Sequence, residues 1–464
     1  MRGFAGPVRP PAPYAIRIPG EPHTMKRFLA ILLSALFLTP FPARAGSNAF
    51  QQTNLVSDQS GKANHTDSQL VNPWGIAFLP GAPFWVADNN SGVSTIYDAN
   101  GVKASLVVTI PAFGGSGTGT PTGIVANNTV NFGGYAFLFC TEDGSIVGWK
   151  SGTTGIFLAN QPSAVYKGLA LITNASGSFL LATNFLAGTV DVYDTNVRPT
   201  SLPGNFTDPT APAGYAPFGI HVVGGMVYVT YAKQDTSKRD PVLGKGLGFV
   251  DVFDLNGSLV KRFATGGMLN APWGTVLAPA SGFGAFSGAL LVGNFGTGQI
   301  VAYDATTGKS LGMMKDAQGK AIKNSGLWEM VYGAGGTGSP TTLYIAAGIK
   351  NETHGLFAAI SVVPVTLLPA SLKFSSPVSK TSASKVATLS NNSAAAITIN
   401  SVAVNDSHFI ITSNTCGATL AAGASCKIKV AFLPTQKGTV TGTLSVTDTG
   451  AGSPQTAALT GTGT

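Results

Sequence analysis

The chain has 464 residues, of which 44% are hydrophobic and only 10% are charged, and it contains 59 glycines. This length allows two or three domains with proper cores, and the apolar content is too high for a disordered chain. Little charge combined with much glycine is typical of exported all-β proteins with many short strands and tight turns.

The net charge of +8 suggests a nucleic-acid partner at first, but most of it lies at the amino end. Residues 1–45 hold six Lys or Arg and one Glu, so they account for +5 and leave +3 for the rest of the chain. No run of basic residues is left to neutralise a phosphate backbone. We therefore expect no nucleic-acid partner.

The amino end has the layout of a secretory signal peptide. A basic segment that begins at Met25 precedes an apolar run at residues 28–38, and a small-x-small cleavage site follows at residues 43–45. The run is shorter than the roughly 20 residues that span a bilayer. We expect residues 1–45 to be a leader and signal peptide with its true start at Met25, and the mature protein to be secreted or periplasmic. For residues 1–24, a genuine amino-terminal arm is the alternative to a misplaced start.

One pattern recurs six times between residues 72 and 363. Each copy has an opening glycine before an apolar run, then an apolar second strand, and then a third strand that often ends in an aromatic residue and Asp. The opening positions are Gly75, Gly123, Gly168, Gly219, Gly274 and, in the last copy, Glu329. Units of this length with three or four strands match the blades of a β-propeller. The sequence predicts an all-β fold with a six-bladed propeller at residues 46–363.

A closed six-bladed ring leads to two further predictions. The opening glycines should lie near the axis, where inner strands crowd and a Cβ atom would clash. The segment at residues 50–56 has the character of a strand but no partner in its own repeat, while the sixth repeat lacks a fourth strand. We predict that residues 50–56 supply the outer strand of the sixth blade and so join the two ends of the ring.

The composition changes at residue 364 to Ser, Ala, Thr and Val with short alternating strands. Residues 364–464 therefore suggest an immunoglobulin-like β-sandwich. Cys416 and Cys426 lie ten residues apart and suit one local disulfide in an oxidising compartment. The third cysteine, Cys140, lies in an apolar strand and is expected to be a buried, inert thiol.

Two family resemblances accompany this reading. Residues 50–58, 70–75 and 141–144 resemble an uncharacterised family of exported bacterial propellers, loosely related to NHL-type repeats, and that resemblance covers residues 50–363. Residues 409–438, with their two cysteines, resemble the hydin-type domain of exported bacterial proteins, which implies an appended interaction or spacer module. Such propeller proteins often end in a membrane-sorting tail. The end of this sequence has no apolar helix or Arg cluster, so we expect no transmembrane anchor after signal cleavage.

Four polar residues occupy one aligned position between the second and third strands of their repeats: Asp88, Glu142, Asn184 and Asn294. Equivalent positions in a propeller lie on one ring of the same face, so these side chains are candidates for a binding site. Oxygen ligands from several blades could hold Ca²⁺, or they could bond a sugar or lactone. The alternative is that they only close turns by accepting bonds from backbone N–H groups, which is also the reading for the Asp98, Asp194, Asp254 and Asp304 series.

His221 and Glu329 complete the candidate set, because both occupy inner-strand positions that could face the channel. A charged side chain there is costly unless it is paired or solvated. The tryptophans of the inner strands are expected to be core rather than stacking platforms. A charged insertion at residues 233–246 is predicted to be a mobile rim loop that could cap a pocket.

The sequence has no zinc-binding pattern, no nucleophile elbow and no phosphate-binding loop, so no catalytic residue and no metal ligand is assigned. We therefore favour an exported monomeric scaffold whose propeller face engages a protein or glycan, without a cofactor. The alternative is a lactonase-like or lyase-like enzyme with a central divalent cation, which fold analogy alone supports.

Overall fold

The computed structural model describes residues 47–464. The predicted leader at residues 1–45, with its start at Met25, lies outside the described residues. Apart from three short 3-10 turns, the regular elements of the described chain are strands. The turns are η1 (Phe113–Gly115), η2 (Phe132–Gly134) and η3 (Gly284–Phe286). No helix among residues 47–464 is long and apolar enough to cross a membrane.

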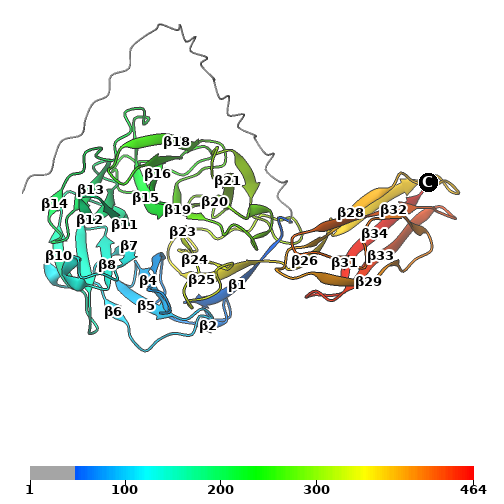
Figure 1. The fold of residues 1–464 in the computed structure, drawn as a ribbon, viewed down its shortest axis with the longest axis horizontal. Coiled ribbons are helices and arrows are strands. Elements are labelled where there is room, and N and C mark those ends of the chain that lie inside the picture. The colour runs from blue at the N-terminus through cyan, green and yellow to red at the C-terminus, as the bar shows by residue number, and fades with distance from the viewer. Residues whose placement is uncertain (1–46) are drawn as a thin grey trace, which may run out of the picture. The chain divides into compact units, whose positions relative to one another are not determined.

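Six sheets surround a common axis, as Figure 1 shows. In blades one to five the strands follow one another in chain order and pair antiparallel. Blade six also takes two strands from the start of the described chain, and its two outermost strands pair parallel. The first strands of successive blades pack against each other, and β23 (Leu327–Tyr332) of the last blade packs against β3 (Pro73–Ala77) of the first, which closes the ring. The predicted blade count of six is therefore confirmed.

The strands of the first three blades have these bounds. Blade one comprises β3 (Pro73–Ala77), β4 (Phe84–Asp88), β5 (Val93–Tyr97) and β6 (Val108–Thr109). Blade two comprises β7 (Pro121–Ala126), β8 (Phe137–Thr141), β9 (Ser145–Trp149) and β10 (Ile156–Asn160). Blade three comprises β11 (Tyr166–Asn174), β12 (Gly177–Asn184), β13 (Thr189–Tyr193) and β14 (Pro199–Thr200).

The second half of the ring is built in the same way. Blade four comprises β15 (Tyr215–Val223), β16 (Met226–Lys233), β17 (Phe249–Phe253) and β18 (Leu259–Thr265). Blade five comprises β19 (Pro272–Leu277), β20 (Ala289–Asn294), β21 (Ile300–Asp304) and β22 (Ser310–Met313). Blade six comprises β23 (Leu327–Tyr332), β24 (Leu343–Ala347), β25 (Leu356–Val362), β1 (Phe50–Ser57) and β2 (His65–Thr66).

The opening glycines lie where neighbouring inner strands approach closely. A Cβ atom on Gly219 would lie 2.2 Å from the carbonyl oxygen of Trp273 in the next blade. A Cβ atom on Gly123 would lie 2.3 Å from the backbone nitrogen of Leu169. The expected crowding at the axis is thus present, and only a residue without a side chain fits these two positions.

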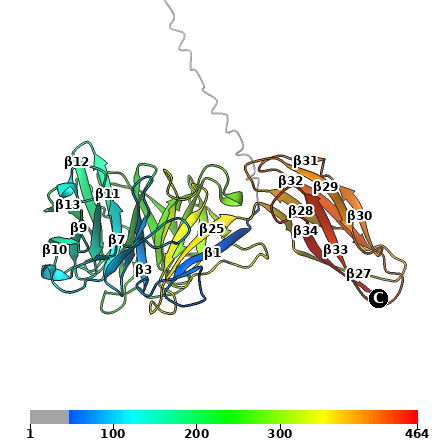
Figure 2. The ribbon, with the colours of Figure 1, turned by 90° about the horizontal axis from the view of Figure 1, so that it is seen from below.

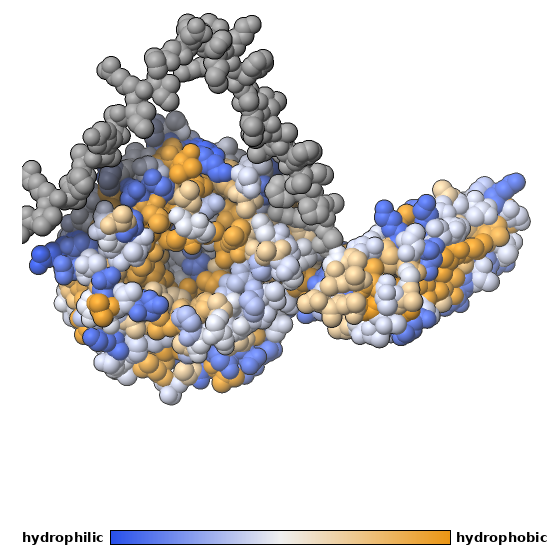
Figure 3. Space-filling model, viewed as in Figure 1, coloured by the Kyte–Doolittle hydropathy of each residue, from blue (hydrophilic) through white to orange (hydrophobic). Residues whose placement is uncertain are grey.

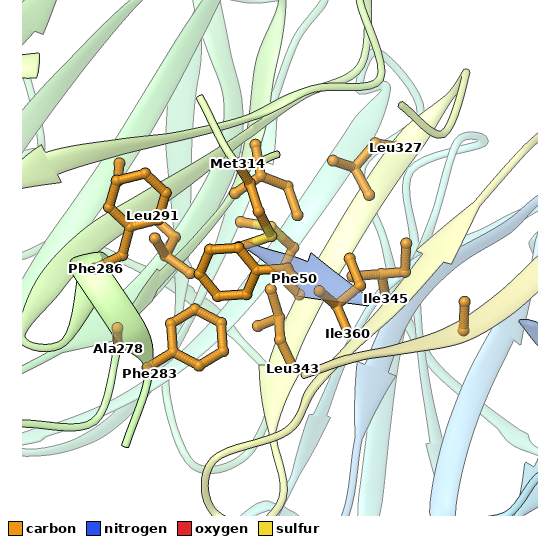
Figure 4. Packing of buried hydrophobic residues seen from close by; sticks show 14 of the residues in the cluster. Phe50, Ala278, Phe283, Phe286, Leu291, Met314, Leu327, Leu343, Ile345 and Ile360 are labelled. Carbon is orange, nitrogen blue, oxygen red and sulfur yellow. The ribbon is translucent and has the colours of Figure 1, made fainter. Parts of the chain in front are cut away.

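The first strand of the described residues closes the ring as predicted. β1 pairs antiparallel with β25, from Phe50 opposite Val362 to Ser57 opposite Leu356, and the two strands lie side by side in Figure 2. Phe50 anchors the strand, because only 1% of its surface is exposed and its ring lies 4.9 Å from that of Phe283. Figure 4 shows Phe50 among the side chains of blades five and six.

The C-terminal region forms two packed sheets. One sheet has the order β26 (Val365–Leu368), β28 (Lys385–Asn391), β32 (Ser425–Phe432) and β30 (Phe409–Asn414). The other has the order β27 (Ser371–Ser376), β34 (Gln455–Gly463), β33 (Gly438–Asp448), β29 (Ile397–Val404) and β31 (Thr419–Leu420). Apolar residues from both sheets make one core, as in an immunoglobulin-like sandwich.

The cysteines divide as the sequence suggested. Cys416 and Cys426 form a disulfide within the sandwich, with their Cα atoms 5.0 Å apart. Cys140 is a buried free thiol in β8. Burial raises the pKa of the Cys140 thiol to about 12, so the reactive thiolate is disfavoured.

Candidate functional site

A cavity of about 690 Å³ opens where the inner strands begin and the second strands end. Its walls come from blades one, two, three, five and six and from the blade-four insertion. The charged lining residues are Glu142, Asp143, Lys167, Arg239, Asp240 and Glu352. The uncharged ones are Asn72, Trp74, Asn89, Asn90, Thr120, Pro241, Leu243, Phe295, Trp328 and Asn351. Figure 3 shows the ring hollowed at the centre of the face turned to the viewer.

The predicted ring of four polar residues is wrong as a single constellation, and the strand register explains why. Asp88 lies opposite Pro73 in blade one, whereas the residue opposite Pro121 in blade two is Thr141. Glu142 is therefore one position further along than Asp88. Because side chains alternate between the two faces of a strand, a shift of one residue changes where the side chain points.

The other three members of that ring are buried and make hydrogen bonds within their own blades. Asp88, Asn184 and Asn294 are each at most 3% exposed. Asp88 accepts bonds from the backbone and hydroxyl of Thr95 at 3.0 and 2.7 Å. Asn294 accepts a bond from the backbone N–H of Asn270 at 2.8 Å. These three side chains are structural, but only Asn184 closes the turn after it, by accepting a bond from the backbone N–H of Ala187 at 3.2 Å.

In three blades, the position that lines the cavity is the one equivalent to Asn89, one residue after Asp88. In blades one, two and five it is occupied by Asn89, Glu142 and Phe295, and all three line the cavity. In blades three and four it is occupied by Phe185 and Ala232, which belong to the apolar cluster around the axis. Glu142 is thus the one member of the predicted ring that lines this cavity.

Lys167, on β11, is the central residue that the sequence reasoning missed. Its side chain is only 1% exposed, and its Nζ lies 2.6 Å from Oε1 of Glu142 and 3.3 Å from Oδ1 of Asp240. The same ammonium lies 5.2 Å from the centroid of the Trp74 ring. A signal was present in the sequence, because the residue before the opening Gly or Glu is uncharged in the other five repeats.

A chain of polar contacts continues from Lys167 toward blade six. Asn89 donates to Oε2 of Glu142 at 3.2 Å, and Asn72 Nδ2 lies 3.4 Å from Oδ1 of Asn89. Asn72 also donates to Oε1 of Glu352 at 3.1 Å. With Asp240 at the other end, the contacts run through blades six, one, two, three and four.

Glu352 is positioned by a turn with an uncommon backbone. Lys350, Asn351 and Glu352 have φ values of 52°, 55° and 63°, so three consecutive residues other than glycine are left-handed. The N–H of Glu352 donates to the carbonyl of Gly348 at 3.1 Å, and the side chain of Asn90 donates to the carbonyl of Glu352 at 2.7 Å. Left-handed geometry costs L-residues about 1–2 kcal/mol each, and such strain clusters at ligand sites.

The electrostatic state of Glu352 follows from its surroundings. Burial raises the pKa of this carboxyl, and the nearby carboxylates of Glu142 and Asp240 raise it further, while Asn72 and Lys167 oppose the change. Glu352 has no ion pair with any of the described residues. It is therefore an acid whose negative charge lacks a paired cation.

Below the cavity, aromatic side chains fill the axis. The rings of Trp74 and Trp328 stack at 3.4 Å, and Trp273 meets both edge-on. All three are at most 2% exposed, which confirms that they are core. The indole Nε1 of Trp74 is buried without a hydrogen-bond partner among the described residues.

His221 and Glu329 lie at the opposite mouth of the channel, away from the other candidates. Both line a mainly apolar cavity of about 340 Å³. Nε2 of His221 lies 3.0 and 3.2 Å from the two oxygens of Glu329, so the pair joins blades four and six. The expected channel-facing position is confirmed, and the pairing explains how an inner carboxylate is tolerated.

The insertion after β16 contributes to the cavity wall. Arg239, Asp240 and Leu243 line the cavity, and Leu243 is 51% exposed. The Asp98, Asp194, Asp254 and Asp304 series closes turns as expected, since each side chain accepts bonds from backbone N–H groups that follow it. Among residues 47–464 there is no group of three His, Cys, Asp or Glu side chains that could hold a metal ion.

Comparison with known proteins adds the following. Residues 363–456 match the family described as "Abnormal spindle-like microcephaly-assoc'd, ASPM-SPD-2-Hydin". The chain is similar to a PQQ-bound aldose sugar dehydrogenase from Streptomyces coelicolor, with a TM-score of 0.42, 14% identity and coverage of 68% of this chain and 100% of that one. At this TM-score the likeness adds nothing to the fold, which rests on the strand pairing above.

Two viral proteins are more similar in sequence. Uncharacterized protein R648 of Acanthamoeba polyphaga mimivirus is 32% identical over 310 residues, which is 62% of this chain and 75% of the viral protein. Uncharacterized protein L690 of the same virus is 31% identical over 349 residues, which is 70% of this chain and 89% of the viral protein. The chain belongs to the family of β-propeller proteins that includes these two mimivirus proteins.

Proposed function

We propose that this protein is an exported binding scaffold whose propeller cavity holds a hydroxyl-rich ligand, such as the end of a glycan chain. The sandwich serves as an interaction or spacer module beside it. The observation that carries the proposal is the polar network around the buried Lys167, which underlies an open cavity. A cavity of about 690 Å³ lies within the range of about 300–1,000 Å³ that is usual for small-ligand sites.

The lining suits hydroxyl groups because it offers both donors and acceptors at close range. Carboxylate oxygens of Glu352 and Asp240 accept, while the amides of Asn90 and Asn351 both donate and accept. A sugar hydroxyl also donates and accepts, so each one can pair with such a set.

Calorimetric titration of the full mature chain with a panel of mono- and oligosaccharides tests the proposal. We expect at least one saccharide to bind, and we expect the Lys167→Met variant to bind it at least tenfold more weakly. Asp240→Asn, which changes a 72%-exposed side chain, should weaken binding without disturbing the fold. Lys429→Met, on the exposed side of β32, is the matched control and should bind normally.

Two results would contradict the scaffold function. One is the failure of every saccharide to bind. The other is a calcium-dependent thermal shift, reversed by EDTA, together with bound metal and turnover of a lactone, which would favour the lactonase-like or lyase-like enzyme instead.

A further inference from the structure

The carboxylates of the cavity differ in what they already bind. Glu142 is fully engaged, with Lys167 on Oε1 and Asn89 on Oε2. Asp143 accepts bonds from Thr141, two residues before it, and from the backbone N–H of Phe113 in η1. The carboxylate oxygens of these two acids are therefore already occupied by hydrogen bonds within the protein.

Glu352 is in a different position. Its one side-chain partner is the neutral amide of Asn72, at 3.1 Å from Oε1. The second oxygen, Oε2, makes no hydrogen bond with a described residue, and it is not among the fully buried atoms. One face of this carboxylate is thus open toward the cavity that it lines.

The backbone fixes Glu352 in that position. Its left-handed turn is tied by the bond from Asn90 to its carbonyl and by the bond from its own N–H to Gly348. A half-buried carboxylate without a cation is costly, and the strained turn adds to that cost. A ligand that brings a positive charge to Oε2 would offset both.

The charge of the whole lining leads to the same class of ligand. Four carboxylates and two cations line the cavity, and one of the cations, Lys167, is already paired with Glu142 and Asp240. The other, Arg239, lies on the exposed insertion. The cavity is therefore acidic overall, which favours a cationic ligand over an anionic one.

We propose that the glycan carries a free amino sugar, whose protonated amine pairs with Glu352 while its hydroxyls bond the amides around it. This inference rests on the proposed glycan-binding function and narrows it. No bond is made or broken in the step. The ammonium donates to Oε2 of Glu352, and Oε1 keeps its bond from Asn72.

Pairing with a cation favours the ionised form of Glu352, so binding must release a proton wherever the free carboxyl is protonated. Because burial raises the pKa of Glu352, the affinity should rise as the pH increases through that pKa. A neutral sugar would release no proton.

The experiment compares three oligosaccharides of the same length by calorimetry: a glucosamine oligomer, its N-acetylated form and an unsubstituted glucose oligomer. We expect the free amine to bind at least tenfold more tightly than the other two. Titrations at several pH values above about 4.3, the usual pKa of Glu, in buffers of different ionisation enthalpy should show net proton release for the amine alone.

Glu352→Gln keeps the bond from Asn72 and removes the charge. In this variant we expect the preference for the amine to fall below threefold and the proton release to vanish. Asp98→Asn, in an exposed turn of blade one, is the control and should keep the preference.

The outcomes separate the two proposals. Equal binding of all three oligomers would overturn the amine inference and leave the glycan function standing. Binding of spermidine as tight as that of the glucosamine oligomer would also overturn it, because the sugar would then contribute nothing. If no oligomer binds, the proposed function itself fails.

Discussion

At the scale of single residues, Asp88 shows how a polar group can be structural even though it first resembles a ligand. One of its oxygens accepts two bonds from Thr95, and the other, Oδ1, is buried without a partner among the described residues. Burial raises the pKa of Asp88 well above its usual value. Protonation of Oδ1 relieves the cost of a buried, unpaired charge.

A pH-dependent stability follows from Asp88. In the unfolded chain its pKa is about 3.9. Between that pH and the higher folded pKa, the folded state binds more protons than the unfolded state. The free energy of unfolding should therefore fall as the pH rises, by at most about 1.4 kcal/mol per pH unit from this group.

The Asp88→Asn variant should flatten that slope, because an amide does not titrate. Urea unfolding of both proteins at pH 5, 6 and 7 measures the difference in slope. Asp98→Asn removes a carboxylate that is exposed at a turn and should leave the slope of the wild type unchanged. Parallel slopes for the wild type and Asp88→Asn would show that Asp88 is ionised in the fold.

At the scale of elements, β1 is the part on which ring closure depends. Phe50 is 1% exposed and packs against Phe283 and Phe286. Replacing a buried Phe by Ala typically costs about 3–5 kcal/mol. We expect Phe50→Ala to lower the free energy of unfolding of the propeller by that amount, as measured by chemical denaturation.

Gln51→Ala, at the next and exposed position of the same strand, should cost less than about 0.5 kcal/mol, as surface substitutions usually do. A negligible loss in Phe50→Ala would contradict the role of β1 as the fastener of the ring.

The elements also show what a sequence can reveal here. Repetition made the blades visible, because five of the six inner strands carry a glycine, such as Gly219, where a Cβ atom would meet the next blade. The unpaired strand at residues 50–56 was visible for the complementary reason that the sixth repeat lacked a strand. Both inferences depend on features that a sequence states directly.

The site was harder to predict from the sequence than the fold, because its contacts join different blades. Glu142 was found, but its alignment with Asp88 was one residue out, and only the register of β7 and β8 corrects it. The pairing of Glu142 with Lys167 joins two blades whose relative rotation no local pattern specifies. The left-handed turn at Glu352 carries no glycine, so the usual signal for such a backbone is absent.

At the scale of the whole molecule, the described chain has two kinds of core. The propeller distributes its apolar residues over clusters between adjacent blades, and the sandwich has one cluster between its two sheets. A small sandwich buries less surface than a large ring and gains more from a covalent link. The disulfide of the described chain lies in the sandwich, where such support matters most.

Reduction of Cys416–Cys426 should therefore act on one part of the molecule. The link closes a short loop and joins a strand of the core, since Cys426 is 6% exposed on β32. For a loop this short, the lost constraint on the unfolded chain is worth about 2–3 kcal/mol. Calorimetry of the full mature chain should show two transitions, and reductant should lower the midpoint of the sandwich transition alone.

The Cys416→Ser/Cys426→Ser variant provides the control for this experiment. It should match the reduced wild type and should not respond to reductant, because its remaining thiol, Cys140, is buried and unpaired in the propeller. If reductant shifts both transitions together, the two regions unfold as one cooperative unit. The sandwich would then stabilise the propeller as well as accompany it, and a spacer role for the sandwich would be insufficient.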